Sequence, residues 1–582
     1  MRPIPKTAVL TGSTVYETIL NSCRAHKEKT ALISQNSPTS EYKYRDVERI
    51  VTGAAGSLKS RGFRKGQRAG ILSENRPEWG LSYLAILAAG GTVVPLDSSW
   101  KEQELLRTIR SSGITTVFTT AKWYPFLREL NLADNRPLEI IGLDDIITPN
   151  LLAICNAAPF QASDISRNDL AALIYTSGTT GEPKGVMLTH RNLIANLEGI
   201  VAALEFYPED LFLSVLPLHH TFEATCGLLT PLTLGLTVAY ARSLKSRDIL
   251  NDISRYRVTC MVAVPLLFEK IYNSITRKIE ELPFHKRVFL KIFFNISSFG
   301  WSLGLKPGRL LFRGLRHRAG LGSIRLFVSG GAPLPAEIAR WFNLTGFDFL
   351  EGYGLSECAP VVAVNRPHKI QFGSVGPPLP NIEVKIVEPS SDGVGEIAVK
   401  GENITAGYLN NRRATEELIC DGWLYTGDLG QVKDGYLYIT GRKKNVIVSA
   451  AGKNIYPEEI EAELMLSPCI LEALVLGRKR SGKMGEEVCA IILPDLEQIN
   501  RYPPATTGES GESVIRRIIK EEVEAVNNRL ADYKRLCQFE IRTEEFEKTS
   551  SRKIKRTLYN WHEQKQPVER DNEIQGDRTG RK

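Results

Sequence analysis

Hydrophobic and polar positions between residues 40 and 204 alternate between helix-like and strand-like spacing. Six apolar side chains recur three or four residues apart and predict a helix with one buried face: Tyr44, Val47, Ile50, Val51, Ala54 and Leu58. Four apolar runs predict short buried strands: 69–72, 93–96, 115–118 and 170–174. A further helix is expected after Thr189, whose hydroxyl is a suitable N-cap. This alternation predicts an α/β fold with mostly parallel sheets covered by helices.

Shorter strands dominate the next part of the chain. Residues 373–442 contain alternating runs separated by Gly, Pro and Asn-Asn turns, which predicts a β-rich subdomain. We expect it to complete a large N-terminal domain of residues 1–443. A small, mobile α/β C-terminal domain is predicted over 444–562, beginning with a helix near Pro457. The last segment, 563–582, is predicted to be a disordered tail.

Composition narrows the class of protein. The chain has 582 residues, too many for one core, and 74 basic against 66 acidic residues give a net charge of +8. This excess is small for so long a chain, so no nucleic-acid partner is expected. Nine cysteines without a Cys-x-x-Cys pair favour a reducing, cytoplasmic location. The longest uncharged run, 224–241, contains a proline and two glycines and is predicted to be buried core rather than a membrane span.

Residues 175–185 have the sequence YTSGTTGEPKG and follow the predicted strand at 170–174. Glycines let an anion approach the backbone N–H groups, and Lys184 adds a positive charge, so the segment is predicted to bind phosphate. It is not a Walker A loop, because Lys184 is followed by Gly185 and not by Ser or Thr. Taken alone, the composition also fits an ordinary surface turn.

Further motifs follow along the chain: LPLHHTFE at 216–223, VSGGAPL at 328–334, EGYGLSECAP at 351–360, DGWLYTGDL at 421–429, GRKKN at 441–445 and EKTSSRKIKR at 547–556. With the loop at 175–185, their order resembles that of the adenylate-forming enzymes, which include acyl-CoA synthetases, luciferases and peptide-synthetase adenylation domains. The chain is most similar to AMP-forming acyl-CoA synthetases. Residues 359–365 resemble the long-chain fatty-acid members more than the amino-acid-activating ones.

This resemblance implies ATP, Mg²⁺ and CoA as cofactors or substrates, beside a fatty acid. It implies that the following residues bind the nucleotide or CoA: Thr176, Ser177, Gly178, Thr179, Thr180, Gly181, Gly330, Gly331, Ala332, Glu351, Gly352, Tyr353, Gly354, Ser356, Asp428, Arg442 and Gly452. Within this set, Asp428 would bind the ribose hydroxyls and Tyr353 would stack on the base.

The resemblance also implies the residues that act on the reacting groups. Lys184, His220 and Lys553 would be catalytic, and Glu357 with Thr176 would provide oxygen ligands to Mg²⁺. Lys444 would be the hinge about which the C-terminal domain rotates. Three positions depart from the family pattern, since Ser356 replaces threonine, Glu547 replaces proline and Arg552 replaces glycine.

The implied reaction has two halves. The carboxylate attacks the α-phosphate of ATP to give an acyl-adenylate and pyrophosphate, and CoA then displaces AMP. Two alternatives stay open: a sibling enzyme that transfers the acyl group to a carrier protein, and a non-catalytic relative that binds nucleotide or acyl groups. The oligomeric state, a homodimer included, also stays open.

The segment 277–318 has the most unusual composition in the chain. It contains ten Lys or Arg against two Glu, interleaved with seven aromatic residues. Such a stretch suits the interface of an anionic membrane, which would place the protein peripherally at the inner face of a membrane. A solvated helical insertion packed on the main domain is the alternative.

Overall fold

The computed structural model describes residues 4, 12–35, 37, 39–133, 138–145, 147–160, 164–176, 183–479, 485–500, 511–548 and 554–561. It divides into a large unit, Met1–Val446 with Tyr456–Ser467 and Lys548–Ile554, and a small unit, Ile447–Ile455 with Pro468–Glu547 and Lys555–Lys582. The predicted boundary at Lys444 lies just before Ile447, where the small unit begins, and stays a prediction. The predicted tail at 563–582 lies outside the described residues.

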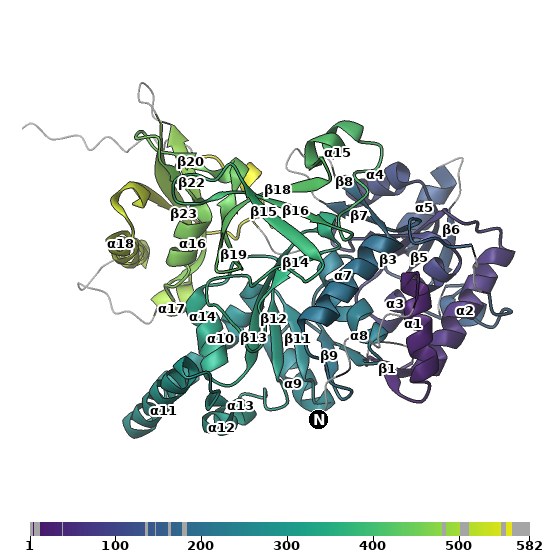
Figure 1. Ribbon diagram of the computed structural model, residues 1–582, viewed down its shortest axis with the longest axis horizontal. Coiled ribbons are helices and arrows are strands. Elements are labelled where there is room, and N and C mark those ends of the chain that lie inside the picture. The colour runs from purple at the N-terminus through teal and green to yellow at the C-terminus, as the bar shows by residue number, and fades with distance from the viewer. Residues whose placement is uncertain are drawn as a thin grey trace, which may run out of the picture. The chain divides into compact units, whose positions relative to one another are not determined.

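An eight-stranded sheet forms one half of the large unit (Figure 1). Its order is β14 (Val361–Val364), β13 (Asp348–Gly354), β12 (Leu326–Ser329), β11 (Cys260–Ala263), β9 (Leu211–Ser214), β10 (Thr237–Tyr240), β1 (Thr30–Ile33) and β2 (Glu41–Lys43). Only the two edge strands, β14 and β2, pair antiparallel to their neighbours. The interior is therefore parallel, and its strands are buried.

A six-stranded sheet forms the other half. Its order is β6 (Glu139–Gly142), β5 (Ile114–Thr119), β3 (Arg68–Leu72), β4 (Thr92–Leu96), β7 (Leu170–Thr176) and β8 (Lys184–Thr189). All neighbours are parallel except β7 and β8, which form an antiparallel pair. The prediction of mostly parallel, helix-covered sheets is thus confirmed, and the strands predicted at 69–72, 93–96, 115–118 and 170–174 are β3, β4, β5 and β7.

Helices fill the space around these sheets. The first group is α1 (Val15–Ala25), α2 (Tyr44–Ser60), α3 (Pro77–Ala88), α4 (Glu102–Ser112), α5 (Tyr124–Ala133), α6 (Leu151–Ile154), α7 (His190–Ala203), a π-helix η1 (Glu223–Leu229), α8 (Thr230–Thr233) and α9 (Ser246–Tyr256). Every residue of α3 is buried, and Trp79 stacks on Tyr83 there at 5.5 Å. Thr189 caps α7 as predicted, because its Oγ1 accepts from the backbone N–H of Asn192. The run 224–241 is buried core, and no helix in the described part of the chain could cross a bilayer.

A second core lies under β12 and β13. Phe268, Phe327, Phe342 and Phe349 pack with ring centroids 4.8–6.2 Å apart. They come from α10 (Pro265–Glu280), β12, α14 (Ala336–Leu344) and β13. The short 3₁₀-helix η2 (Ser356–Cys358) follows β13.

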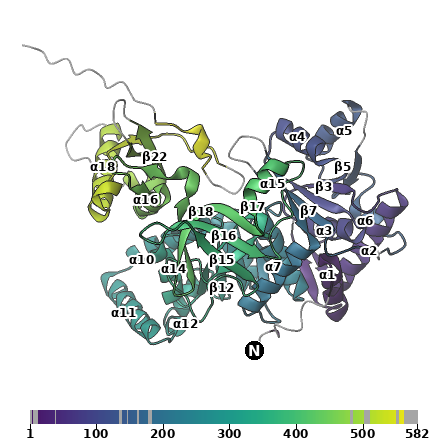
Figure 2. The ribbon, with the colours of Figure 1, turned by 45° about the horizontal axis from the view of Figure 1, so that its top comes forward.

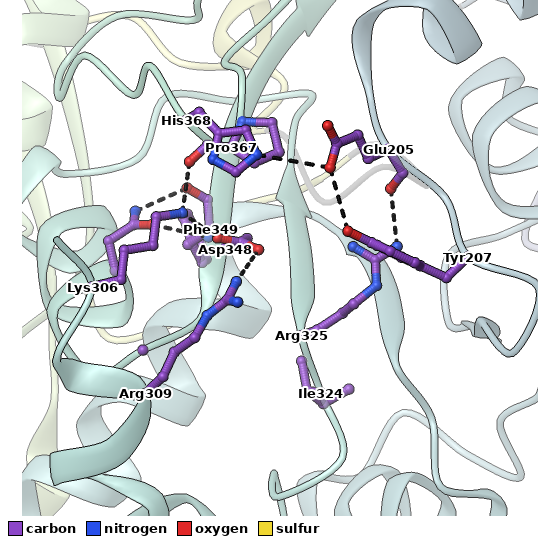
Figure 3. A network of polar contacts seen from close by, with 12 residues as sticks. Glu205, Tyr207, Lys306, Arg309, Ile324, Arg325, Asp348, Phe349, Pro367 and His368 are labelled. Atoms are coloured by element: carbon purple, nitrogen blue, oxygen red, sulfur yellow. Dashed lines mark hydrogen bonds and ion pairs between the residues drawn. The ribbon is translucent and has the colours of Figure 1, made fainter. Parts of the chain in front are cut away.

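The basic aromatic segment folds as helices on the large unit. They are α11 (Phe284–Ser302), α12 (Gly308–Leu311) and α13 (Arg313–Arg318), after the C-terminal part of α10. Ion pairs fix α12 to the start of β13, since Lys306 and Arg309 each lie 2.5 Å from the Asp348 carboxylate (Figure 3). Beside this network, Arg325 donates to the Glu205 carbonyl at 3.1 Å.

A five-stranded sheet is the predicted β-rich subdomain. It contains β15 (Ile382–Val387), β16 (Gly395–Gly401), β17 (Ile419–Cys420), β18 (Trp423–Lys433) and β19 (Tyr436–Arg442), all antiparallel, with α15 (Arg412–Leu418) before β17. The 3₁₀-helix η3 (Lys443–Asn445) follows β19, and α16 (Pro457–Leu464) also belongs to the large unit. Figure 2 shows this sheet from a second direction.

The small unit has its own short sheets. β20 (Ile447–Val448) pairs with β21 (Asn454–Ile455), and β22 (Ile470–Lys479), β23 (Glu486–Pro494) and β24 (Gln538–Ile541) form a three-stranded sheet. The helices α17 (Leu496–Ile499) and α18 (Gly511–Arg529) and two 3₁₀ turns, η4 (Asp532–Lys534) and η5 (Arg556–Leu558), complete it. The predicted mixture of strands and helices in this region is confirmed.

Candidate active site

Three predicted motifs follow the carboxyl ends of neighbouring parallel strands. The segment with His220 follows β9, the Gly330 turn follows β12 and Ser356 follows β13. Because β9, β11, β12 and β13 are adjacent and parallel, these loops emerge at one edge of the sheet, where ligands bind in open α/β folds. Thr221 Oγ1 donates to Ser356 Oγ at 3.2 Å and joins the first loop to the third.

Gly330 is required by close packing. A Cβ at this position would lie 2.9 Å from the Phe222 ring, so any larger residue would displace that ring. Gly331 has φ +88°, a conformation that favours glycine, and both Gly331 and Ala332 are exposed. The turn therefore presents accessible backbone beside the Phe222 ring.

Glu351, Gly352, Tyr353 and Gly354 are not in a turn, as the sequence had indicated, but form the end of β13. The reason is pairing with the edge strand β14, in which Gly352 lies opposite Val364 and Tyr353 opposite Ala363. A Cβ at Gly354 would lie 2.1 Å from the Pro360 carbonyl oxygen, so this strand end also needs glycine. The turn begins only with η2, which contains Ser356 and Glu357.

Lys184 and Glu357 meet at a residue that the sequence analysis missed. The Tyr408 hydroxyl donates to Glu357 Oε1 at 2.8 Å, and the ammonium of Lys184 lies 5.0 Å from the centre of the Tyr408 ring. Tyr408 reaches this place because the backbone bridges Val186. Its only signal in the sequence is an aromatic residue after Gly407, in a Gly-Tyr-Leu-Asn-Asn segment.

Thr176 ends β7 opposite Lys184, which begins β8, and its Oγ1 donates to the Lys184 carbonyl at 3.5 Å. The intervening Ser177, Gly178, Thr179, Thr180 and Gly181 lie outside the described residues. The segment 405–409 connects this hairpin to the Glu357 turn. Within it, the Leu409 N–H donates to the Gly185 carbonyl at 2.8 Å, and the Thr405 N–H donates to the Glu357 carbonyl at 2.7 Å. The ends of the predicted phosphate loop are therefore tied to the predicted metal ligand.

Asp428 lies on β18 and connects the β-rich subdomain to the same site. Its carboxylate accepts from the Tyr353 hydroxyl at 2.7 Å through Oδ2 and pairs with Arg442 Nε at 2.6 Å through Oδ1. The Asp428 side chain is only 7% exposed, whereas Arg442 is 44% exposed. Burial, with the adjacent carboxylate second, holds the pKa of Tyr353 well above its usual value, so this hydroxyl stays a donor.

The two adjacent histidines lie against each other with ring centroids 4.3 Å apart. His219 Nε2 is 3.4 Å from Asp97 Oδ2, a buried carboxylate at the end of β4 that the sequence analysis did not single out. His220 begins the turn into η1, because its carbonyl accepts from the Ala224 N–H at 3.0 Å. The buried Asp97 therefore positions the pair from the His219 side.

Two acidic groups near these loops are buried. Burial raises the pKa of Glu223, the first residue of η1, to about 8 and that of Glu351 also to about 8. Both carboxyl groups therefore retain their proton at neutral pH. Glu223 packs closely against its own π-helix, since a Cβ at Gly227 would lie 2.5 Å from its Oε1.

The remaining predicted residues fall elsewhere or cannot be placed. Lys444 lies in η3, directly after β19. Gly452 lies in the small unit, in the turn between β20 and β21, with φ +71° and its N–H bonded to the Ser449 carbonyl at 2.9 Å. Lys553 lies outside the described residues. Among the described residues there is no group of three or more His, Cys, Asp or Glu that could hold a metal ion.

The model of the family described as "AMP-binding enzyme" matches residues 19–409. The chain belongs to this family. The match covers both large sheets, the hairpin around Lys184, the His220 and Ser356 loops and Tyr408. Asp428, Arg442 and the small unit follow the matched segment.

Relatives of this AMP-binding enzyme cover most of its length. It is 32% identical over 499 residues to the long-chain-fatty-acid–CoA ligase FadD15 of Mycobacterium bovis, covering 80% of this chain and 79% of that protein. It is 26% identical to a chloroplastic long-chain-fatty-acid–[acyl-carrier-protein] ligase of Arabidopsis thaliana, covering 86% and 79%.

Solved structures have the same fold. The ATP-bound RpMatB-BxBclM chimera B1 aligns with a TM-score of 0.75 at 25% identity, covering 94% of this chain and 98% of the other. The O-succinylbenzoate–CoA synthetase of Bacillus subtilis, in complex with ATP and a magnesium ion, aligns with a TM-score of 0.70 at 25% identity, covering 93% and 98%. The expected fold, a large N-terminal domain with a smaller C-terminal one, is that of adenylate-forming enzymes.

Proposed function

We propose that this AMP-binding enzyme activates a long-chain fatty acid with ATP and transfers the acyl group to CoA. A carboxylate oxygen attacks the α-phosphorus and pyrophosphate leaves; the CoA thiolate then attacks the acyl carbon and AMP leaves. The observation that carries the proposal is a set of contacts at one edge of the eight-stranded sheet. Thr221–Ser356 joins two loops of that sheet, Tyr408–Glu357 links it to the segment that bridges β8, and Tyr353–Asp428 links it to the five-stranded sheet. The names of the relatives favour the long-chain substrate.

Nucleotide binding is assigned to the Tyr353–Asp428–Arg442 group. Asp428 would accept hydrogen bonds from the ribose hydroxyls, because a carboxylate has about four acceptor sites and two donors already use two of them. Gly330, Gly331, Ala332, Glu351, Gly352 and Gly354 would surround the base, and Ser356 would contact the phosphates. The exposed backbone at Gly331 supports this assignment.

Mg²⁺ is assigned to Glu357 and Thr176. A half-buried carboxylate and a hydroxyl are hard oxygen donors of the kind that Mg²⁺ prefers, and two protein ligands are enough when substrate phosphates supply others. When bound, the ion would offset negative charge on the triphosphate. The Tyr408 hydroxyl would hold the Glu357 carboxylate in one orientation, and the residues 176–181 with Lys184 would bind the phosphates.

The reacting carboxylate is assigned to the His220 side of the site. His220 would orient it, while Lys184 and Lys553 would stabilise the charge that develops between carboxylate and phosphate. A C-terminal domain of residues 444–562 would then rotate about Lys444. This rotation would let CoA reach the acyl-adenylate along a path that Gly452 lines. We also infer a cytoplasmic enzyme that contacts the inner face of an anionic membrane through residues 277–318.

The direct experiment is a panel of carboxylates of increasing chain length with ATP, Mg²⁺ and CoA. Pyrophosphate and AMP release should rise together and favour long chains. Failure of every carboxylate to release pyrophosphate would leave a non-catalytic binding protein and refute the proposal.

Transfer to a carrier protein is the second candidate function. The Arabidopsis relative, named an acyl-carrier-protein ligase, favours it. The two candidates differ only in the acceptor, so acyl-adenylate prepared on the enzyme should be offered free CoA and holo-carrier protein in parallel. Faster discharge by CoA supports the first candidate, and faster discharge by the carrier protein supports the second.

A further inference from the structure

The helix α11 exposes a mostly apolar face, in which His285 and Asn295 are polar residues. Seven large apolar side chains on or next to it are 37–74% exposed: Phe284, Val288, Phe289, Ile292, Ile296, Phe299 and Leu303. At 3.6 residues per turn these positions fall within one arc of about 140°. An exposed arc of this width marks an interaction surface, since single exposed apolar residues are normal but contiguous ones are not.

The opposite side of α11 is the side that packs on the large unit. Ser297 and Gly300 are buried there, and Ser297 Oγ donates to the Leu344 carbonyl at 2.7 Å. The Phe294 ring lies 4.7 Å from that of Phe312 and 6.2 Å from that of Trp341. Packing thus accounts for one apolar side of the helix and leaves the exposed arc unexplained. Figures 1 and 2 both show α11 at the periphery of the large unit.

Charge distinguishes between possible occupants of this face. α11 contains no acidic residue, and Lys286, Arg287 and Lys291 form no ion pair with any described residue. By contrast, Lys306 and Arg309 of the same segment both pair with the carboxylate of Asp348 (Figure 3). Three cations without a carboxylate partner among the described residues therefore lie on the same helix as the apolar arc. A second copy of this chain would bring like charges together, whereas anionic headgroups complement them.

We propose that α11 is a docking helix for an anionic lipid bilayer. It lies in the plane of the interface, with the apolar arc among the upper acyl chains and Lys286, Arg287 and Lys291 at the phosphates. At about 28 Å for 19 residues the helix provides a long contact line, and the Asp348 ion pairs hold the neighbouring α12 to the start of β13. If the proposed function holds, this surface places the enzyme where amphipathic carboxylates are concentrated.

The test is flotation of the full chain with vesicles of equimolar phosphatidylcholine and phosphatidylglycerol, against vesicles of phosphatidylcholine alone. The parent should float with the anionic vesicles. Phe289→Asp should lower the partition coefficient of the protein into anionic vesicles at least about tenfold, because the bilayer would receive a charged group in place of a phenyl ring. Leu244→Asp is the matched control, since Leu244 is 59% exposed in the segment between β10 and α9, and it should float like the parent.

Charge is tested separately. The triple variant Lys286→Gln, Arg287→Gln and Lys291→Gln should lose the preference for anionic vesicles and the sensitivity of binding to salt. A matched variant that neutralises Arg64, Lys245 and Lys433, which are exposed outside this segment, should keep both.

Two outcomes would overturn the proposal. One is flotation of Phe289→Asp at the parental level. The other is a parent that dimerises without binding vesicles and becomes monomeric on Phe289→Asp, because a second copy would then occupy the face. Pyrophosphate release with decanoate in the absence of lipid is measured in parallel. It should be equal in the parent and Phe289→Asp, so that failure of docking and failure of the proposed function can be distinguished.

Discussion

Removal of a single hydroxyl at Tyr408 separates two roles assigned to this side chain. Tyr408→Phe keeps the ring that lies 5.0 Å from the Lys184 ammonium and deletes the donor to Glu357 Oε1. Tyr408 is half-buried, so the cavity left by one oxygen atom is small. The expected consequence is confined to the orientation of the Glu357 carboxylate.

The magnitude follows from the geometry of that bond. At 2.8 Å it is a hydrogen bond to a carboxylate, and such bonds contribute about 1.5–3 kcal/mol. Partners that orient a metal ligand change metal affinity by roughly 10–100-fold when removed. Because the site is only half-buried, we expect the lower end, a rise of about tenfold in the Mg²⁺ concentration needed for half-maximal pyrophosphate release.

The assay is a Mg²⁺ titration of fatty-acid-dependent pyrophosphate release at saturating ATP. Tyr207→Phe is the matched control, because the Tyr207 hydroxyl bonds Glu205 at 3.3 Å in the network of Figure 3. It should titrate like the parent, whereas Tyr408→Leu should also lower the maximal rate by releasing Lys184. An unchanged or lower Mg²⁺ requirement in Tyr408→Phe would refute the assignment of Glu357 as a metal ligand.

Three further predictions concern stability and the two half-reactions. Burial raises the pKa of Glu223 to about 8 in the folded state, whereas the carboxyl group of the unfolded chain loses its proton above about pH 4.5. Between these two pH values the folded state holds one proton more than the unfolded state. The free energy of unfolding should therefore fall by about 1.4 kcal/mol per pH unit in this range. Glu223→Gln stays neutral and should show a flatter dependence in denaturant unfolding; parallel curves would contradict this. Lys553→Ala should slow adenylate formation about a hundred- to a thousand-fold and leave thioester formation from supplied acyl-adenylate nearly intact. Lys548→Ala and Lys555→Ala are the controls. Full activity of Lys553→Ala would place the catalytic lysine elsewhere. Lys444→Pro should slow transfer to CoA and spare adenylate formation, and equal loss in both halves would move the hinge.

Elements with a strong local pattern could be predicted from the sequence. The apolar spacing of 44–58 and the cap at Thr189 predict α2 and α7, because both signals act within a few residues. The motif at 328–334 likewise marks the end of β12.

Features that depend on distant pairing could not be predicted in this way. Tyr408 enters the site only because its backbone pairs with Val186, more than two hundred residues earlier, and Asp97 meets His219 from another sheet. Pairing with β14 also extends β13 through Gly354, where local composition indicated a turn. For the segment 277–318, composition indicates a membrane interface or a helical insertion but does not say which side chains are buried, so the exposed arc of α11 emerges only with the tertiary structure.

The central claim is that the carboxylate is activated as an acyl-adenylate and then passed to CoA. The most direct measurement uses palmitate labelled with heavy oxygen in its carboxylate, with ATP, Mg²⁺ and CoA, and mass spectrometry of the nucleotide product. Attack on the α-phosphorus leaves one palmitate oxygen on AMP when the thiol takes the acyl group, so the account predicts AMP that carries one heavy oxygen, with equal amounts of pyrophosphate and palmitoyl-CoA. Unlabelled AMP, or ADP and phosphate in its place, would contradict it.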